Sequence, residues 1–220
     1  MHIASWSGGK DSCLACYLAM RKGLKISHLV HFDRPNNLHG VDPAMIRLQA
    51  ELAGLAMVQR RVVSEDFERE FKDTVSHLKQ EGVMGIVFGD IYLEPHKEWV
   101  DRVCGELGIA AEEPLWGMNT EKIVKDFLAF GFETIIASGK QDLIDKKWIG
   151  RKMDIEFIDY LKTRGLDVCG ENGEFHTFVT AGPLFQGKID VTRSAVVAKD
   201  GFWFLDIQEH TVVRQEAAVS

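Results

Sequence analysis

The sequence contains little of what would mark a membrane, secreted or disulfide-rich protein. Its 220 residues include four cysteines and five prolines, and no apolar run approaches the roughly 20 residues that cross a bilayer. The chain does not begin with a basic segment followed by an apolar core, so we expect a cytoplasmic protein with free thiols and no membrane association. Basic charge is also scarce. Because 26 basic residues face 33 acidic ones, a net charge of -7 disfavours general nucleic-acid binding.

The few cysteines argue against a structural zinc site. Cys13 and Cys16 form one Cys-x-x-Cys pair, and the sequence has neither a second pair nor a His-x-x-x-His to complete four ligands. A thiolate near a helix start would suit sulfur transfer. The pair lies among Leu, Ala and Tyr residues, however, and small buried cysteines are ordinary packing residues, so we favour a packing role.

The distribution of apolar residues predicts an α/β fold. Short β-branched and aromatic runs alternate with segments whose apolar residues recur every three or four positions. The predicted strands are residues 3–6, 26–32, 57–63 and 83–89, and the predicted helices are residues 12–22, 43–53, 67–81 and 98–107. This alternation indicates a Rossmann-like parallel sheet with helices on both faces and ligands at the carboxyl ends of its strands.

The pattern changes after about residue 118, which indicates a second, smaller α+β domain. Helices are predicted near 119–130 and 154–164, and strands near 133–137, 175–180, 189–198 and 202–209. Asp200-Gly201 fits a two-residue type I′ hairpin turn, because both positions of that turn need positive φ. The apolar run at 202–205 suggests a homodimer contact. We therefore predict a nucleotide-binding domain over 1–118 and a substrate-binding domain over 119–220.

One loop between the first predicted strand and helix carries a phosphate-binding pattern. Glycines let the backbone approach an anion, and loop N–H groups, a helix start and a lysine supply positive charge. The spacing is not that of a Walker A loop, because Ala4 stands where that pattern has its first Gly. The six residues expected to bind nucleotide here are Ser7, Gly8, Gly9, Lys10, Asp11 and Ser12.

This loop resembles the pyrophosphate loop of the N-type ATP pyrophosphatases, in the adenine nucleotide alpha hydrolase-like superfamily. Four more segments make the chain similar to the diphthine–ammonia ligase family and its bacterial relatives: Leu38-His39-Gly40-Val41, Phe88-Gly89-Asp90-Ile91, Pro114-Leu115-Trp116-Gly117 and residues 170–177. The family has a Glu-Gly-Gly-Glu-Tyr-Glu-Thr signature in its second domain. Glu171, Gly173, Glu174 and Thr177 match it, whereas Asn172, Phe175 and His176 replace Gly, Tyr and Glu. His176 is expected to titrate near neutrality.

The resemblance implies an ATP-dependent ligase that adenylates a substrate carboxylate, releases pyrophosphate and amidates the carboxylate with ammonia. ATP and Mg²⁺ are the implied cofactors, with a carboxylate-bearing substrate and ammonia as partners, and the resemblance leaves the acceptor open. Asp11 and Asp90 are the implied metal ligands. Phe32, His39, Gly89 and Asp90 join the loop in binding nucleotide. The implied catalytic residues are Lys10, Asp11, Glu171 and Glu174; the two glutamates would orient substrate or accept a proton from the amine.

Two other functions stay open from the sequence. A tRNA-modifying or sulfur-transfer ATPase could use the same loop, although the acidic charge and the single Cys-x-x-Cys pair weaken this reading. A non-catalytic ATP or AMP sensor would bind nucleotide and present the carboxy-terminal hairpin to a partner. The basic stretch 140–152 is most simply a solvated face, and within it Arg151 best matches the family pattern.

Overall fold

The structure is a computed structural model that describes residues 1–34, 38, 40–62 and 66–214. By its internal contacts the chain divides into two compact units. The first unit comprises Met1–Ser7, Asp11–Asn37 and Leu55–Met118, and the second comprises Gly8–Lys10, Leu38–Gly54 and Asn119–Ser220. The two continuous domains expected from the sequence stay a prediction, since two short segments of residues 1–118 group by contact with the second unit.

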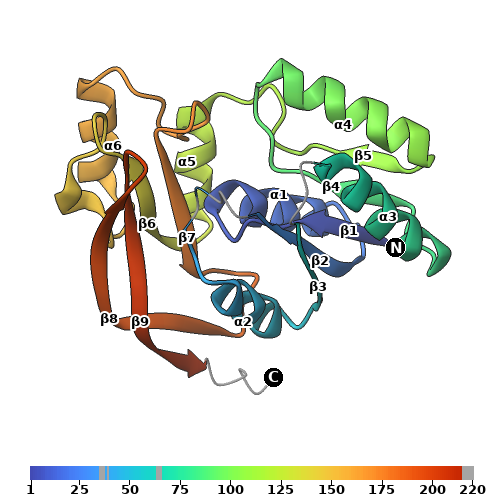
Figure 1. Cartoon of the computed structure of the whole chain (residues 1–220), viewed down its shortest axis with the longest axis horizontal. Helices are drawn as coiled ribbons and strands as arrows, with labels where there is room; N and C mark the ends of the chain where they lie inside the picture. Colours follow the sequence, from blue (N-terminus) through green and yellow to red (C-terminus); the bar gives the residue numbers. More distant parts are fainter. Residues whose placement is uncertain (35–37, 39, 63–65, 215–220) are drawn as a thin grey trace. The chain divides into compact units, whose positions relative to one another are not determined.

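The first unit is built on a parallel five-stranded sheet with strand order β3-β2-β1-β4-β5 (Figure 1). Its strands are β1 (His2–Ser5), β2 (Ile26–Asp33), β3 (Ala56–Arg61), β4 (Gly85–Val87) and β5 (Ala110–Glu112), and its helices are α1 (Lys10–Arg21), α3 (Phe67–Gln80) and α4 (Glu94–Leu107). The crossovers β1–β2 and β3–β4 run in opposite directions across the sheet. Right-handed connections therefore put α1 on one face and α3 with α4 on the other.

The core of the first unit lies between the sheet and helices α3 and α4. Side chains on one face of β1, β2 and β4 meet the apolar stripes of both helices, and each fully buried one contributes roughly 1.5–3 kcal/mol. The cluster contains Ile3, Val30, Phe71, Val75, Leu78, Val83, Ile86, Phe88, Val100, Val103 and Cys104. Apolar residues at every second position of β1 and at every third or fourth position of α3 thus account for the core of the first unit.

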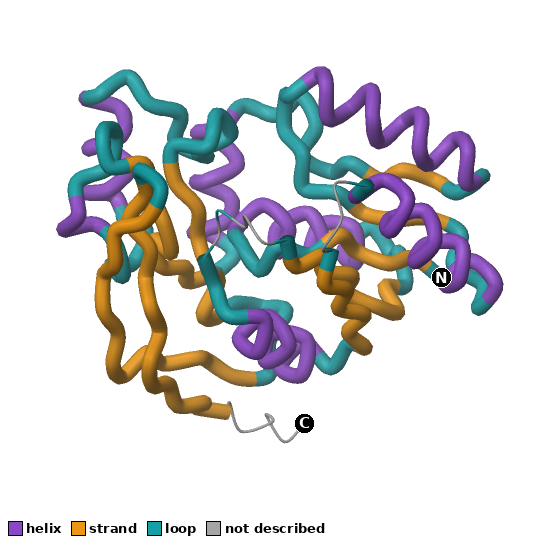
Figure 2. The backbone as a smooth tube through the Cα atoms, in the orientation of Figure 1, coloured by secondary structure: helices purple, strands orange, loops and turns teal. Residues whose placement is uncertain are grey.

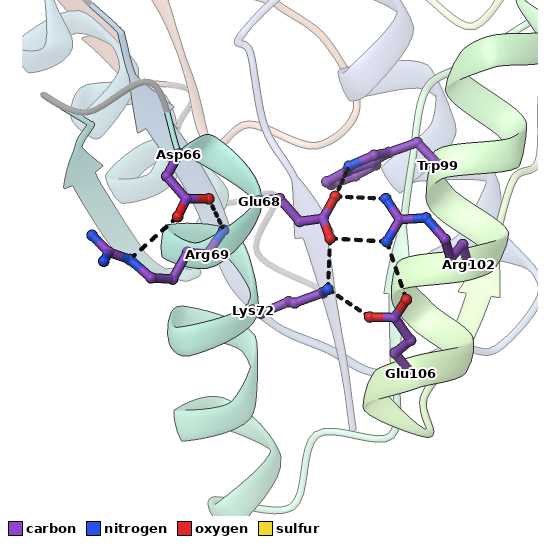
Figure 3. Close-up of polar contacts among 7 residues, drawn as sticks. All are labelled: Asp66, Glu68, Arg69, Lys72, Trp99, Arg102 and Glu106. Carbon is purple, nitrogen blue, oxygen red and sulfur yellow. Dashed lines mark hydrogen bonds and ion pairs between the residues drawn. The ribbon is translucent and has the colours of Figure 1, made fainter.

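Charged side chains join α3 and α4 outside this core in a set that we call the α3–α4 network (Figure 3). The Glu68 carboxylate accepts hydrogen bonds from Lys72 at 2.6 Å, from Trp99 Nε1 at 3.0 Å and from Arg102 at 2.9 and 2.6 Å. Glu106 lies 2.5 Å from Lys72 and 3.1 Å from Arg102. Hydrogen bonds from Arg102, then from Lys72, hold the pKa of the Glu68 carboxyl well below its usual range.

The second unit contains a four-stranded sheet with strand order β7-β6-β9-β8, in which every strand pairing is antiparallel. Its elements are β6 (Glu133–Lys140), β7 (Phe175–Ala181), β8 (Gly187–Lys199), β9 (Phe202–Arg214), α2 (Pro43–Ala53), α5 (Thr120–Ala129), α6 (Ile155–Thr163) and a 3₁₀ turn at Lys146–Trp148. Figure 2 shows the β8–β9 hairpin as a long ribbon of two strands. Its turn residues Asp200 and Gly201 have φ of 49° and 79°, which confirms the predicted turn.

Side-chain caps set where the helices of the second unit begin. The Asp42 carboxylate accepts from the Ala44 N–H at 2.7 Å ahead of α2, and Asn119 and Asp154 do the same for α5 and α6 at 3.1 and 3.0 Å. Such caps satisfy N–H groups that have no partner inside the helix. Gly54 ends α2 in the left-handed region, with φ of 65°.

The α/β fold class and all predicted helices and strands are confirmed, with shifted ends. The structure adds β5 and the 3₁₀ turn, which are each only three residues long. None of the helices in the described part of the chain combines the length and apolarity that a membrane crossing requires. The homodimer contact at 202–205 stays a prediction.

Candidate functional site

The loop of residues 7–12 follows β1 after Trp6, and its last three residues, Lys10–Ser12, form the first turn of α1. The Trp6 N–H donates to the Val30 carbonyl at 2.8 Å, which continues the β1–β2 pairing up to the loop. The Ser7 and Ser12 hydroxyl oxygens lie 3.1 Å apart and join its two ends. Asp11 lies in the first turn of α1, where a carboxylate complements the helix dipole. The predicted strand–loop–helix context of a phosphate loop is therefore present.

The middle of the loop is hydrogen-bonded to β7. The Gly8 carbonyl accepts from the Val179 N–H at 3.0 Å, and the Lys10 N–H donates to Thr177 Oγ1 at 3.0 Å. Gly8 has φ of 79°, and a Cβ there would lie 2.5 Å from Ile46 Cδ1. Only glycine can occupy this position, because both the backbone conformation and the space exclude a side chain.

Gln49 of α2 also holds the loop, and it is not among the site residues expected from the sequence. Its side chain is 0% exposed, and Nε2 donates to the Gly8 carbonyl at 3.0 Å and to the Val179 carbonyl at 2.7 Å. The sequence does carry a signal, since Gln49 lies among the apolar positions Ile46, Ala50 and Leu52 that α2 buries. A polar residue in such a stripe indicates a buried hydrogen-bonding role.

The ammonium group of Lys10 lies among residues of its own, second unit. The side chain is 3% exposed, Nζ donates to the Cys169 carbonyl, and the Phe175 ring centroid is 5.5 Å away. The phosphate contact predicted for Lys10 stays a prediction. What the described contacts establish is a link between the loop and the segment that carries the two candidate glutamates.

That segment, residues 170–174, is a turn shaped by two glycines. Gly170 and Gly173 both have φ of 74°, and the Gly173 N–H donates to the Gly170 carbonyl at 3.0 Å. The Glu171 N–H donates to the Asp167 carboxylate at 3.0 Å. The glycines are required here because L side chains rarely adopt this backbone conformation. They bring Glu174 to the start of β7.

Glu174 is the buried acid of the turn, with 5% exposure. Its Oε1 atom accepts a 3.2 Å hydrogen bond from Asn172 Nδ2, and its backbone carbonyl accepts from the Lys140 N–H at 2.9 Å. The Oε2 atom is buried and has no hydrogen-bond partner among the residues that the structure describes. Because a buried polar atom without a partner costs free energy, Oε2 is suited to a donor supplied by a ligand.

A second set of candidate residues lies at the carboxyl ends of β1 and β4. A Cβ on Gly89 would lie only 2.9 Å from the Asp11 carbonyl carbon and the Ser12 nitrogen. Asp90 comes next, and its Oδ1 atom lies 3.0 Å from His96 Nδ1. The loop after β4 thus approaches the first turn of α1, at the sheet edge where ligands bind in such folds.

Asp11 and Asp90 have the donor chemistry that Mg²⁺ prefers. Mg²⁺ usually takes one or two carboxylates and completes its shell with waters and phosphate oxygens. Within residues 1–34, 38, 40–62 and 66–214 no group of three or more His, Cys, Asp or Glu side chains could hold a metal ion. This chemistry suits a metal that arrives with a nucleotide better than a closed metal centre, and the roles of Asp11 and Asp90 as its ligands stay predictions.

Comparison with known proteins decides the family. Residues 1–111 match the diphthamide synthase N-terminal domain, and residues 119–216 match the diphthamide synthase C-terminal domain. The chain belongs to the diphthamide synthase family. The diphthine–ammonia ligases of Rattus norvegicus and Homo sapiens are 27% and 29% identical to it, over 89% and 87% of this chain and 85% and 82% of their own.

One solved structure also resembles the chain, and it is described as a predicted subunit of a tRNA methyltransferase from Methanocaldococcus jannaschii. It is 15% identical, has a TM-score of 0.45, and the match covers 83% of this chain and 98% of that structure's chain.

The two family domains include the two parts of the candidate site. The N-terminal family domain includes the loop of residues 7–12, and the C-terminal family domain includes the turn of residues 170–174.

His176, which replaces a glutamate of the family signature, has a lower pKa than the sequence suggests. The expectation that His176 titrates near neutrality is wrong. Burial, and then the positive charges of Lys10 and Lys140, lower the pKa of His176 to about 4. The imidazole is therefore neutral at pH 7.

Two nucleotide-binding predictions gain no support from the geometry. The Phe32 ring packs against Phe67 and Phe71, with centroids 5.3 and 5.6 Å apart, so it contributes to the α3–α4 side of the core. Its contact with a nucleotide stays a prediction. His39 lies outside the described residues.

The cysteines fit the packing interpretation. Cys13 and Cys16 are fully buried. Burial raises the pKa of the Cys16 thiol to about 12 and that of Cys13 well above its usual value. Both thiols stay protonated at neutral pH, so neither is an activated nucleophile.

Two basic side chains of the stretch 140–152 are paired with acidic residues. Arg151 lies 2.9 Å from Glu156, and Lys152 lies 2.6 Å from Glu133. The guanidinium of Arg151 further stacks 4.6 Å from the Trp148 ring centroid. These contacts are those of a solvated, paired surface, as the sequence favours.

Proposed function

We propose that this protein is an ATP-dependent ligase that converts a substrate carboxylate into an amide. A carboxylate oxygen attacks the α-phosphorus of ATP, and pyrophosphate leaves with the electron pair of the broken P–O bond. Ammonia then attacks the acyl carbon of the resulting acyl adenylate, AMP leaves, and the nitrogen loses a proton to a base. Membership of the diphthamide synthase family and the similarity to proteins named diphthine–ammonia ligase support this chemistry.

The observation that carries the proposal is the buried carboxylate of Glu174. A base for the second step must be anionic, close to the nitrogen and not already saturated with donors. The Oε2 atom meets the last condition, since it lacks a hydrogen-bond partner among the described residues. An ammonia or amine N–H supplies the missing donor and afterwards gives up its proton to this oxygen. Asn172 holds the other oxygen at 3.2 Å and so orients the group.

The loop of residues 7–12 is the proposed site for the phosphates of ATP. Its backbone N–H groups and the start of α1 favour an anion. Asp11 and Asp90 would hold Mg²⁺, which offsets the phosphate charge when it is bound. The close approach at Gly89 supports this pairing, because it brings the β4 loop to the first turn of α1.

The acceptor is proposed to be a molecule with a free carboxylate, and diphthine is the first candidate because the relatives are named for it. Sulfur transfer is less favoured, since the Cys13 and Cys16 thiols are buried and their pKa values are raised. A nucleotide sensor would share the ATP site and lack the second step.

Product analysis with the wild-type protein tests the proposal. The protein is incubated with ATP, Mg²⁺ and a set of carboxylates that includes diphthine, with and without ammonium. We expect AMP and pyrophosphate in equal amounts with the true acceptor, and an amide by mass spectrometry only when ammonium is present. Formation of ADP and phosphate instead would contradict the proposal, and ATP binding without turnover for every acceptor would favour the sensor.

A further inference from the structure

Lys140, at the end of β6, lies directly opposite Glu174, which leads into β7. The antiparallel register pairs Gly139 with Phe175, and the Lys140 N–H donates to the Glu174 carbonyl at 2.9 Å. Residues opposite each other on antiparallel strands direct their side chains to the same face of the sheet, with Cβ atoms about 4.5–5.5 Å apart. The Lys140 side chain and the buried acid therefore begin side by side, within the second unit.

In the described part of the chain, the Lys140 and Glu174 side chains form no ion pair with each other. The Lys140 ammonium donates to the Asn172 carbonyl at 3.1 Å, and Asn172 Nδ2 donates to Glu174 Oε1 at 3.2 Å. Nor does any other described carboxylate pair with Lys140, in contrast to Lys188, which lies 3.0 Å from Glu133. Because an ammonium group has three N–H donors, Lys140 can donate to a ligand as well as to Asn172.

The pair therefore suits a ligand group that both accepts and donates hydrogen bonds. Lys140 is half-buried, so its ammonium is within reach of a ligand, and Glu174 Oε2 has no partner among the described residues. His176 has a pKa of about 4, so it is neutral at pH 7 and does not offset the positive charge of Lys140. A carboxamide oxygen accepts from an ammonium and its NH2 group donates to a carboxylate, whereas an ionised carboxylate only accepts.

We infer that Lys140 is a further catalytic residue, which donates a hydrogen bond to the acyl oxygen of the acceptor while Glu174 Oε2 accepts from the attacking nitrogen. When ammonia adds to the acyl carbon, the C=O electron pair moves onto that oxygen, and the ammonium stabilises the negative charge. AMP leaves with the electron pair of the bond between the acyl carbon and the phosphate oxygen. The C=O bond re-forms, and Glu174 takes one proton from the nitrogen. The inference rests on the proposed function, because it concerns the second step of that chemistry.

Titration with acetamide and with acetate, followed by nuclear magnetic resonance, tests the paired site without ATP or the natural acceptor. The two probes have nearly the same size, and only acetamide has a donor for Glu174 Oε2. At pH 7 we expect acetamide to shift the Lys140 side-chain resonances and to bind about fivefold or more tightly than acetate, the equivalent of one net hydrogen bond. Lys140→Met should weaken acetamide binding by a similar factor. Equal affinities for the two probes, or no response of Lys140 to either, would overturn the inference.

Kinetics of the two half-reactions test the catalytic role. Lys140→Met keeps a side chain of similar length and removes the charge. We expect amide formation to fall by about 100-fold, while adenylation, measured by ATP–pyrophosphate exchange, stays close to wild type. Lys140→Arg retains the charge and should recover part of the rate. Equal loss of both half-reactions in Lys140→Met would overturn the inference, because a general defect in folding or binding would then explain the effect.

Lys125→Met is the matched control. Lys125 is exposed on α5 and, within the residues that the structure describes, makes no ion pair, so the variant should leave both half-reactions unchanged. Amide formation at the wild-type rate by a folded Lys140→Met protein would overturn the inference alone. A wild-type protein that prefers acetamide but makes no AMP with any acceptor would overturn the proposed function, and the catalytic role of Lys140 with it.

Discussion

The α3–α4 network of the first unit and the Lys10–Glu174–His176 group of the second place charge in opposite environments. Each carboxylate of the network has Lys72 and Arg102 as partners, and its side chains are partly or fully exposed. In the second unit, Lys10 is 3% exposed and Glu174 is 5% exposed. One oxygen of Glu174 lacks a partner in the part of the chain that the structure describes.

The difference distinguishes charged side chains that only join helices from those that are available to a ligand. Exposed, paired charges lose little hydration free energy on folding. They also contribute little to stability, because water and salt screen them. A buried carboxylate with an open oxygen costs free energy, and a fold retains it where a ligand supplies the missing donor. Four predictions, each based on one substitution or a pair of substitutions, break or sharpen this contrast, and they are ordered by the size of the expected effect.

Glu174→Gln should have the largest effect. The amide keeps the size and the oxygen that Asn172 contacts, but it cannot take a proton. We expect the rate of amide formation to fall by about 100-fold or more, with Mg-ATP affinity close to wild type. Glu156→Gln, at an exposed pair with Arg151, is the control and should leave the rate unchanged. A fully active Glu174→Gln would show that the buried acid is structural, and the contrast would fail.

His176 should make stability depend on pH. Its pKa is about 4 in the folded chain against 6.5 for an unperturbed histidine, so the unfolded state binds more protons between these values. Stability therefore falls as the pH drops through this window, by up to about 3 kcal/mol at its acid end, and is unaffected above it. Urea unfolding of wild type and His176→Gln should show the variant losing less stability toward acid. Exposed His210→Gln should follow wild type.

Gly89→Ala and Gly105→Ala should act in opposite directions within the first unit. A Cβ at Gly89 would meet backbone atoms of Asp11 and Ser12 at 2.9 Å, so we expect a loss of about 1–3 kcal/mol. Gly105, inside α4, has nothing within 4 Å of the added carbon. Alanine there should raise stability by about 0.5–1 kcal/mol, because glycine is a poor helix former. Thermal unfolding measures both, and a neutral Gly89→Ala would mean that the β4 loop is free to move from α1.

Glu68→Gln should have the smallest effect. The change removes a carboxylate with three donors, yet the network is at the surface, so we expect the melting temperature to fall by about 3 °C or less. High salt should shrink the difference further. A large decrease in melting temperature that does not depend on salt would show that the α3–α4 network behaves like the buried charges of the second unit. That result would contradict the contrast.

Much of the fold could be predicted because local periodicity encodes it. The apolar spacing located every helix, and alternation with β-branched runs located all strands except β5, whose three residues, Ala110–Glu112, carry no apolar run. Asp200-Gly201 is enough to predict the hairpin turn, because its two residues readily adopt the positive φ values that the turn needs. The grouping of α2 with the second unit could not be predicted, because it depends on which sheet the helix contacts.

The candidate site divides in the same way. Glycines at 8, 89, 170 and 173 and acids at 11, 90 and 174 were visible as motif residues, since their chemistry is local. Burial is a property of the surroundings, so the neutral state of His176 and the open oxygen of Glu174 were not visible. Gln49 was missed because its two acceptors, Gly8 and Val179, are 41 and 130 residues away along the chain.

The sequence by itself determined the elements, the α/β class and the phosphate-type loop, because periodicity, turn chemistry and glycine placement act over a few neighbouring residues. Only the tertiary structure decided the strand orders, the link from Lys10 to Cys169, the Gln49 contact and the charge state of His176. Each of these depends on groups far apart in the chain that folding brings within hydrogen-bonding or Coulombic range. Long-range contact and desolvation set them, and neither can be read from local sequence.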